Sequence, residues 1–299
     1  MKRRSIGIVL AVIGILLVIF GAVWMTAIFP QITKVPSNLK ESTEQQGTMD
    51  LFDSGTGQLL HYDITNTRDY TTEKCSGNII YIWEDIPFTD VATGQDIPAP
   101  HTKTLLAIDR VTRRNVPGHG DGSRDGYWSF PRNVKTDVIY PFWNTGNPSN
   151  LDCIFTGEED FNGMHVYKFE MSTPDDGLVV PAGIATPEMK VYQTVTQWVE
   201  PVSGLTVRVE STTKRTTTIP VQDSLFPNTG PITYTDITLY EDHLTFTDAT
   251  IEKLSHDAKF YHWVLPFAET IVPWLSIGLG LVFIIGSALL IRMASKKSQ

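Results

Sequence analysis

The sequence predicts a mainly β ectodomain, antiparallel and meandering, flanked by one N-terminal and one C-terminal transmembrane α-helix. Two apolar runs without charged residues lie near the ends of the 299-residue chain, at residues 6–29 and 271–291. Between them, segments rich in Thr, Val, Ile and Tyr alternate with turn residues, which is typical of strands joined by hairpins. All 33 acidic residues also lie between the two runs, so we expect a solvated domain there.

The two apolar runs are long enough to cross a membrane as helices. Residues 6–29 form an uncharged run of 24 residues, which at about 1.5 Å per residue extends roughly 36 Å. Residues 271–291 form a second run of 21 residues, about 31 Å long by the same rise. Both reach across a hydrocarbon core of about 30 Å. Because the first run exceeds the roughly 7 to 15 apolar residues of a signal peptide, we expect it to remain as an anchor.

The tails of the chain predict its orientation. Each tail carries three basic residues beside an apolar run: Lys2, Arg3, Arg4, Arg292, Lys296 and Lys297. Lysine and arginine near the ends of a span favour the cytoplasmic side. Trp24, Trp263 and Trp274 suit the opposite, outer interface. The sequence therefore predicts a two-pass protein of the cell membrane, with both termini cytoplasmic and the ectodomain extracytoplasmic.

The charge of the central segment restricts its partners. Residues 30–270 carry 33 acidic and 18 basic residues, a formal charge of −15. This balance argues against binding of nucleic acid, which requires clustered lysine and arginine. The expected partners are the lipid bilayer, envelope or surface components or lipids, and a second copy of the chain in a homo-oligomer.

The central segment shows no Gly/Ser-rich linker or charge block, which favours one continuous domain. Residues 30–48 are too polar to form a core and are predicted to be an extended stalk. The predicted segments are, in order, a cytoplasmic tail (1–5), a transmembrane helix (6–29), the stalk (30–48), a β-rich extracytoplasmic domain (49–248), an amphipathic juxtamembrane helix (249–270), a transmembrane helix (271–291) and a second cytoplasmic tail (292–299).

Two hairpins stand out in the predicted β domain. Residues 201–204 read Pro-Val-Ser-Gly, which suits a type I turn, and apolar and polar residues alternate over 204–210. Asn162-Gly163 suits a tight type I′ turn leading into a strand at 166–169. The other predicted strands cover residues 79–83, 104–109, 137–142 and 237–246.

The pattern changes to helical spacing after Asp248, which is a suitable N-cap residue. Apolar residues then recur every three or four positions: Ile251, Leu254, Ala258, Tyr261 and Leu265. This helix either lies at the membrane surface or continues into the second span through kinks at Pro266 and Pro273. The sequence leaves both arrangements open.

The chain has two cysteines, Cys75 and Cys153, and both fall in the predicted extracytoplasmic domain. Disulfides persist in such a compartment, so we predict that the two residues pair. A closed loop of roughly 80 residues would contribute about 4 to 5 kcal/mol by loop entropy. Two buried free thiols are the alternative.

No catalytic, cofactor-binding or metal-binding residue is predicted. Asp121, Ser123, Asp125 and Gly126 resemble the start of a calcium loop, but the twelfth position is Arg132 instead of a carboxylate, which favours a flexible glycine-rich loop. The seven histidines are scattered, and neither a metal-binding motif nor a nucleophile elbow is present. We therefore expect that the protein is not an enzyme and needs no cofactor.

Small residues recur along both apolar runs. They form one stripe on each predicted helix: Gly7, Gly14 and Gly21 on the first, and Ser276, Gly280 and Ser287 on the second. Such stripes allow helices to approach closely, so each span is expected to pack against the other. Because glycine is frequent in membrane spans anyway, an unspecific stripe is the alternative.

Several segments together resemble a known family. They are 108–112 (IDRVT), 126–131 (GYWSFP), 140–143 (YPFW), the hairpin at 163–169 and the turn region 198–204. In these segments the chain resembles the prokaryotic porin PorA-like membrane family, a domain of unknown function. The resemblance covers nearly the whole chain and implies the same architecture. It names no catalytic residue.

Three functions remain as expectations. The first is a membrane-anchored surface or envelope protein whose β-rich ectodomain has a structural or binding role. The second is a lipid-handling ectodomain with an apolar tunnel or cavity, because the layout resembles that of lipid-conducting scavenger receptors. The third is a subunit of a pore-forming assembly, which would need several copies because two uncharged helices offer no polar pore lining.

Overall fold

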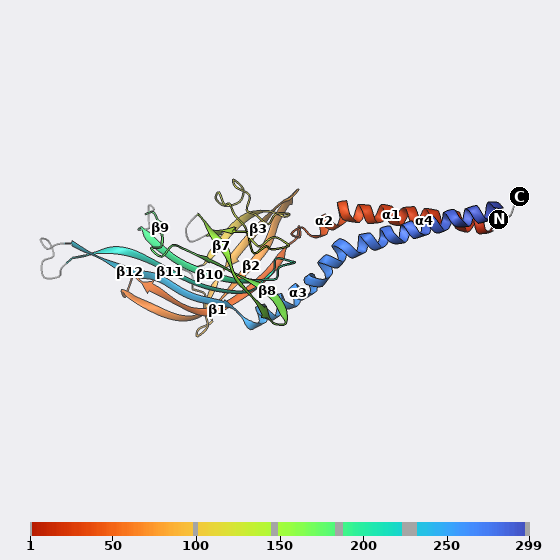
Figure 1. The fold of residues 1–299 in the computed structure, drawn as a ribbon. Coiled ribbons are helices and arrows are strands. Elements are labelled where there is room, and N and C mark those ends of the chain that lie inside the picture. The colour runs from red at the N-terminus through yellow and green to blue at the C-terminus, as the bar shows by residue number, and fades with distance from the viewer. Residues whose placement is uncertain (1, 98–100, 145–148, 183–187, 223–231, 297–299) are drawn as a thin grey trace. The chain divides into compact units, whose positions relative to one another are not determined.

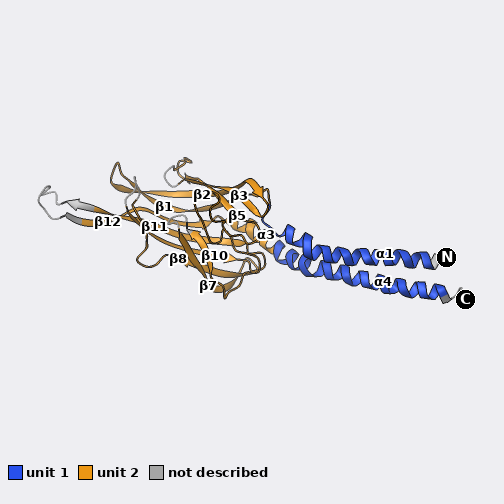
Figure 2. Cartoon of the chain, turned by 90° about the horizontal axis from the view of Figure 1, so that it is seen from above, with its two compact units in different colours: residues 1–36, 260–299 blue, residues 37–259 orange. Residues whose placement is uncertain are grey.

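The computed structural model describes residues 2–97, 101–144, 149–182, 188–222 and 232–296. The chain forms two compact units (Figure 2). Residues 1–36 and 260–299 make a helical unit, and residues 37–259 make a β unit.

Among the described residues, two helices are long and apolar enough to cross a membrane, Arg4–Ile32 and Asp248–Ser295, and the second begins in the β unit, which extends to residue 259. The helical elements are α1 (Lys2–Val23), η1 (Trp24–Ile28), α2 (Phe29–Ile32), α3 (Asp248–Pro266), η2 (Phe267–Ile271) and α4 (Val272–Lys296). Helical backbone continues through η2, so the predicted juxtamembrane helix and the second predicted span form one segment (Figure 1). The elements η1 and η2 are π-helical turns, and each precedes a proline.

Proline has no N–H to donate, which leaves one carbonyl of the preceding turn without its usual partner. Pro30 follows η1, and Pro273 follows η2. In both places the hydrogen bonds shift to a five-residue span: Phe29 donates to the carbonyl oxygen of Trp24, and Val272 donates to that of Phe267. The two prolines therefore widen the helices locally without ending them.

The β unit is one antiparallel sheet. Its described strands are β1 (Lys40–Asp53), β2 (Gln58–Ser76), β3 (Ile79–Ile86), β4 (Phe88–Asp90), β5 (Thr102–Asp109), β6 (Tyr140–Asn144), β7 (Ser149–Phe161), β8 (Met164–Ser172), β9 (Leu178–Val180), β10 (Met189–Val199), β11 (Thr206–Gln222) and β12 (Ile232–Phe246). The order is β5-β3-β2-β1-β12-β11-β10-β8-β7-β6, with β4 beside β2 and β9 beside β10. The expectation of a mainly antiparallel β domain between two apolar helices is confirmed.

The segment between β5 and β6 links the two edges of this sheet. Asn115 pairs with Ile108 of β5, the neighbouring Arg114 pairs with Tyr127, and Tyr127 pairs with Phe142 of β6. The backbone pairing therefore passes from one edge strand to the other. Each edge strand therefore has a backbone partner in this segment, β5 at Ile108 and β6 at Phe142.

Both predicted hairpins are confirmed. In the β7–β8 hairpin, Phe161 is paired with Met164, and both central residues have positive φ, 50° at Asn162 and 69° at Gly163, as a type I′ turn requires. The β10–β11 turn ends at Gly204, which has a φ of 73° and donates to the carbonyl oxygen of Glu200 at 2.9 Å.

Three boundaries differ from the sequence prediction. The predicted stalk at 30–48 includes the first part of β1, which pairs with β2 and β12. Backbone hydrogen bonds place these polar residues in the sheet, and hydropathy does not detect such pairing. The strand predicted at 137–142 begins only at Tyr140. Helix α3 begins at Asp248, and Thr247 caps it by accepting the N–H of Thr250 at 3.3 Å.

Among the residues that the structure describes, three clusters of buried side chains contribute to the core of the β unit. One of them is aromatic, and the other two lie under β1 and β12 and under helix α3. Their buried members are Phe130, Val134, Tyr140, Phe142, Cys153, Phe169 and Val199; Met49, Ile64, Phe88, Ile97, Tyr240 and Leu244; and Met164, Val166, Trp198, Val207 and Ala258. Ala258 belongs to α3, so the third cluster joins this helix to the sheet.

Candidate functional site

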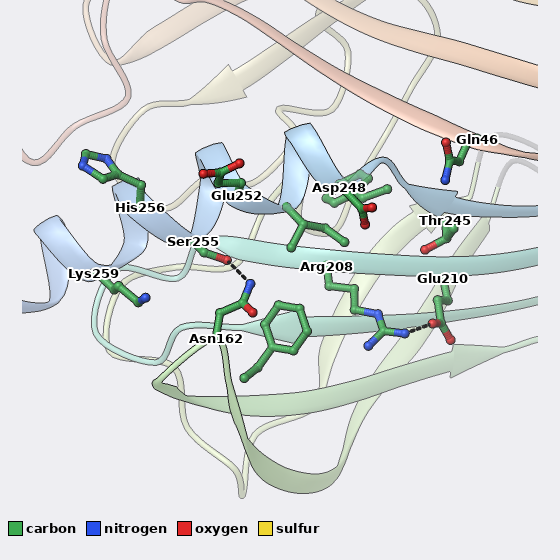
Figure 3. Close-up of a pocket in the computed structure, with 13 residues that line it drawn as sticks. Gln46, Asn162, Arg208, Glu210, Thr245, Asp248, Glu252, Ser255, His256 and Lys259 are labelled. Atoms are coloured by element: carbon green, nitrogen blue, oxygen red, sulfur yellow. Dashed lines mark hydrogen bonds and ion pairs between the residues drawn. The ribbon is translucent and has the colours of Figure 1, made fainter.

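A groove of about 920 Å³ lies between helix α3 and the strands that it covers (Figure 3). Its lining comes from β1, β11, β12, the β7–β8 turn and α3. The lining residues are Gln46, Phe161, Asn162, Arg208, Glu210, Thr245, Phe246, Asp248, Ile251, Glu252, Ser255, His256 and Lys259. Three of them, both phenylalanines and the isoleucine, are apolar, and the other ten bring hydrogen-bonding or charged groups to the groove beside the apolar stems of their side chains.

Helix α3 supplies one charged wall of the groove. Asp248, Glu252, His256 and Lys259 are spaced by four, four and three residues, which places them on one face of the helix. At about 1.5 Å per residue this row is roughly 16 Å long. Figure 3 shows the acidic pair toward the N-terminal end of the helix and His256 and Lys259 toward its C-terminal end. The charge along the groove therefore changes sign.

Arg208 of β11 supplies the opposite wall. Its guanidinium lies over the Trp198 ring, 4.5 Å from the centroid, and 5.6 Å from the centroid of Phe161. It also forms an ion pair with Glu210. Trp198 is fixed in turn, because its Nε1 donates to Glu159 at 2.7 Å. Stacking on an aromatic face and pairing with a carboxylate hold the Arg208 side chain in one orientation.

Hydrogen bonds hold α3 against the sheet. Asn162 Nδ2 donates to Ser255 Oγ at 3.3 Å, a contact visible in Figure 3. The backbone N–H of Glu44 donates to Thr250 Oγ1 at 3.0 Å. Lys253 Nζ donates to the carbonyl oxygen of Ser42 at 3.4 Å. The two walls of the groove are therefore fixed relative to each other.

Three consecutive residues of α3, Ser255, His256 and Asp257, are of the types found in catalytic triads, but their side chains have different surroundings. Ser255 is buried against Asn162, whereas the His256 side chain is 84% exposed and lies 3.5 Å from Asp257. Within the part of the chain that the structure describes, no group of three or more His, Cys, Asp or Glu residues could hold a metal ion.

A second histidine meets a carboxylate on the surface of β3 and β5. His101 Nε2 lies 2.7 Å from Asp85, and Lys103 Nζ lies 2.9 Å from the same carboxylate. These two hydrogen bonds lower the pKa of Asp85. All three side chains are accessible to solvent, which is unlike the buried cleft in which a general base acts. The expectation that the protein is not an enzyme stays a prediction.

The predicted disulfide is wrong, because both cysteines are free. Cys75 is exposed on β2, and Cys153 is buried on β7 in the aromatic cluster. In the sheet order, β1, β12, β11, β10 and β8 separate these strands. Burial raises the pKa of the Cys153 thiol to about 12, so this thiol stays protonated and unreactive. The stabilisation predicted for the bridge is therefore absent.

The structure brings most of the predicted small-residue stripes together within the helical unit. A Cβ atom added to Gly14 would lie 2.6 Å from the carbonyl oxygen of Gly280, and one added to Gly21 would lie 2.8 Å from that of Pro273. Ser287 Oγ donates to the carbonyl oxygen of Gly7 at 2.5 Å.

Two side chains of the helical unit make contacts other than those predicted. Ser276 bonds within its own helix, to the carbonyl oxygen of Val272 at 2.9 Å. Trp24 was predicted only as an interface residue, but its Nε1 also donates to the carbonyl oxygen of Ala268 at 2.7 Å.

The groove residues were not predicted from the sequence. One usable signal was present, since Trp198 and Arg208 flank the predicted turn at 201–204 and face each other across the β10–β11 hairpin. The position of α3 over this hairpin has no comparable signal, because it depends on contacts distant in sequence.

Comparison with known proteins identifies a family. The model of the porin PorA family matches residues 6–289. No curated protein matches the chain. Among solved structures, one match is a domain described as an outer membrane lipoprotein-sorting protein, from Vibrio parahaemolyticus. It is 9% identical and covers 73% of this chain and 87% of that one, with a TM-score of 0.16, which is too low to carry an argument about fold.

The family match spans both apolar helices and the whole β unit between them. It confirms the resemblance found in the sequence motifs, and it is consistent with an envelope-associated protein. The protein therefore belongs to the porin PorA family.

Proposed function

We propose that this protein is a non-catalytic binding module of the cell envelope, anchored in the cell membrane by its two apolar helices. Its β unit would bind an envelope or surface component in the groove beside α3. The groove carries the proposal: its volume of about 920 Å³ lies within the roughly 300 to 1,000 Å³ of typical ligand sites.

The lining of the groove supports a polar ligand. Ten of its thirteen residues are polar or charged, and the acidic pair Asp248 and Glu252 lies at one end of a row that ends at Lys259. A row of about 16 Å matches an extended polar chain better than a compact ion. The charged row along α3 favours a polar ligand over the lipid-handling alternative, because an acyl chain would leave these charges without partners in the groove.

Reversing one groove charge tests the binding function. We expect Glu252→Lys in the full-length protein to weaken cosedimentation with isolated cell envelopes about tenfold, because a charge-assisted hydrogen bond is lost and a like charge is introduced. Glu241→Lys is the matched control, since Glu241 forms an exposed ion pair with Lys214 outside the groove. Equal sedimentation of both variants and the unmodified protein would refute the groove as the binding site.

We further propose the two-pass topology with both termini in the cytoplasm. The basic tails and the acidic centre support this orientation. The free, exposed Cys75 provides the test. A membrane-impermeant maleimide should label Cys75 on intact cells, whereas Ser298→Cys in a Cys75→Ala background should be labelled only after permeabilisation. The reverse pattern would place the β unit in the cytoplasm.

A pore-forming assembly is the second candidate, and the family description favours it. The glycines of the two helices face each other within one chain, so a pore would need several chains. Reproducible conductance steps of the purified protein in planar bilayers would support this function. Their absence, together with envelope binding, would favour the binding module.

A further inference from the structure

Building on the proposed binding function, we infer that the ligand of the groove beside α3 is a neutral carbohydrate chain, bound through its hydroxyl groups. Three features of the groove indicate this class of ligand. They are the pairing of the strands that line it, the mixture of donors and acceptors among its side chains, and its two phenylalanine rings.

On the sheet side, a row of polar side chains crosses three strands. Thr245 of β12 is directly opposite Gln46 of β1 on one side and Glu210 of β11 on the other, so the three side chains lie on one face of the sheet. Figure 3 shows them in this order. Side chains of directly opposite residues are about 5 Å apart. An amide, a hydroxyl and a carboxylate are therefore within reach of one ligand.

The backbone of these strands offers no place for an extended peptide. On its other side, Gln46 pairs with Thr65 of β2. Glu210 likewise pairs with Thr196 of β10. At these described residues β1, β12 and β11 are therefore paired on both sides. An extended peptide commonly binds by adding a strand to a free sheet edge, so recognition in this groove depends on side chains instead.

The charges of the lining favour a ligand without net charge. The lining includes three carboxylates and two cations that are charged at neutral pH, which leaves a formal charge of −1 when histidine is neutral. They are Asp248, Glu252, Glu210, Arg208 and Lys259. A chain of cations or of anions along the groove would meet like charges at one end, and a neutral ligand avoids this repulsion.

Hydroxyl groups suit this mixture of donors and acceptors. A carboxylate only accepts hydrogen bonds and an ammonium or guanidinium group only donates them, whereas a hydroxyl group does both. Arg208 and Glu210 pair with each other. Among the described residues, no hydrogen bond or ion pair occupies the side chains of Asp248, Glu252 and Lys259. Sugar hydroxyls would donate to the two carboxylates and accept from the ammonium group.

Aromatic rings supply the apolar part of the site. Phe161 and Phe246 are half-buried and line the groove. The faces of a sugar ring carry C–H groups, which pack against the electron-rich face of an aromatic ring. Arg208 is held on the Trp198 and Phe161 rings, so it presents its donors from a fixed position and loses little freedom when a ligand binds.

Selective degradation of the envelopes tests the class of ligand. Delipidated cell envelopes are treated either with periodate, which cleaves the vicinal diols of sugars, or with a protease, and are washed before the full-length protein is added in mild detergent. We expect periodate to weaken cosedimentation about tenfold, because the hydroxyl groups that the lining binds are lost. Protease treatment should leave it unchanged. Loss after protease but not after periodate would identify a peptide and overturn the carbohydrate.

Substitutions on the sheet side locate the contact. Thr245→Val keeps the shape of the side chain and removes its hydroxyl group, so it should weaken cosedimentation about three- to fivefold. Gln46→Leu should have a similar effect. Thr48→Val is the matched control, because Thr48 is an exposed residue of β1 outside the lining. Equal binding of Thr245→Val and Thr48→Val would contradict recognition by this row.

A neutral ligand also predicts a weak dependence on salt. Raising the salt concentration from about 0.05 M to about 0.5 M should change cosedimentation less than about twofold, because salt screens the attraction between charges. A loss of about tenfold would indicate a charged ligand and overturn the proposal. If Glu252→Lys weakens binding but periodate does not, only the carbohydrate is refuted. If Glu252→Lys has no effect either, the groove itself is not the binding site.

Discussion

The helical unit and the β unit both use glycine to bring backbones together, but the sequence reveals only one of these uses. In the helical unit, Gly7, Gly14 and Gly21 face α4 at seven-residue intervals, and the period is visible in the sequence. In the β unit, a Cβ atom on Gly47 would overlap the carbonyl oxygen of His243 on β12. Gly47 stands alone between two polar residues. Close contacts of a helix can therefore be predicted from the spacing of its small residues. Close contacts within a sheet depend on the order of its strands, which the sequence does not show.

The two units also differ in their treatment of polar groups. In the helical unit, Trp24 and Ser287 each donate across the helix pair to a backbone carbonyl. In the β unit, the carboxylates of Glu84, Glu200 and Asp242 are buried. Close packing therefore holds the helical unit together, and buried polar contacts add to packing in the β unit.

The largest expected effect is that of Gly47→Ala. The added methyl group would force β1 away from β12, and we expect a loss of about 3 kcal/mol in the free energy of unfolding, as for severe overpacking. Chemical denaturation followed by tryptophan fluorescence would measure it. Gly157→Ala on β7 is the matched control, because no described atom lies within 4 Å of the added Cβ. Similar losses in both variants would contradict the close pairing of β1 and β12.

A smaller effect is expected for Gly14→Val in the helical unit. The added Cβ would lie 2.6 Å from the Gly280 carbonyl oxygen and 2.8 Å from Ile284 Cγ1. Two packed helices can separate more easily than hydrogen-bonded strands, so we expect a loss of about 1 to 3 kcal/mol. Thermal unfolding in detergent, followed by circular dichroism of the helices, would measure it.

Gly278→Val is the control within α4, since no described atom lies within 4 Å of a Cβ atom added there. If Gly14→Val and Gly278→Val unfold at the same temperature, the glycine stripe is an unspecific feature of an apolar helix. That outcome would contradict the statement that glycines bring the two helices together.

The sequence predicts the features that depend on neighbouring residues. The apolar runs, the Asn162-Gly163 turn and the turn at 201–204 all follow from local patterns. The supposed pairing of Cys75 with Cys153 fails because it depends on the order of strands in the sheet, which a single sequence does not show. The contacts of Tyr70 on β2 with Glu84 and Trp128 were also missed.

The local pattern around β2 explains that omission. A bulge between Thr72 and Lys74 shifts the register of β2 against β3, so the alternation of polar and apolar residues changes phase within the strand. Hydropathy therefore does not tell which polar residues of β2 face inward.

The smallest predicted effect concerns the buried carboxylate of Asp242 on β12. It accepts a hydrogen bond from Tyr240, and its Oδ1 has no hydrogen-bond partner among the described residues. Burial raises its pKa above 3.8, although Tyr240, Thr213 and Arg215 oppose the shift. Stability from the protonated form is therefore fully present below pH 3.8, the unfolded value, and is lost as the pH rises through the folded-state pKa.

Asp242→Asn cannot ionise, so it should escape this loss. We expect the stability of the variant relative to the unmodified protein to rise between pH 4 and pH 7.5, because only the unmodified protein loses the contribution of the protonated carboxyl group as the pH rises. Thermal unfolding at both pH values would measure the gain, with the exposed Asp152→Asn as control. A difference between variant and parent that does not grow with pH would mean that Asp242 ionises in the folded protein as easily as an exposed carboxylate. Burial of this carboxylate would then have no measurable effect on the free energy of unfolding, and Asp242 would not distinguish the interior of the β unit from the helix pair.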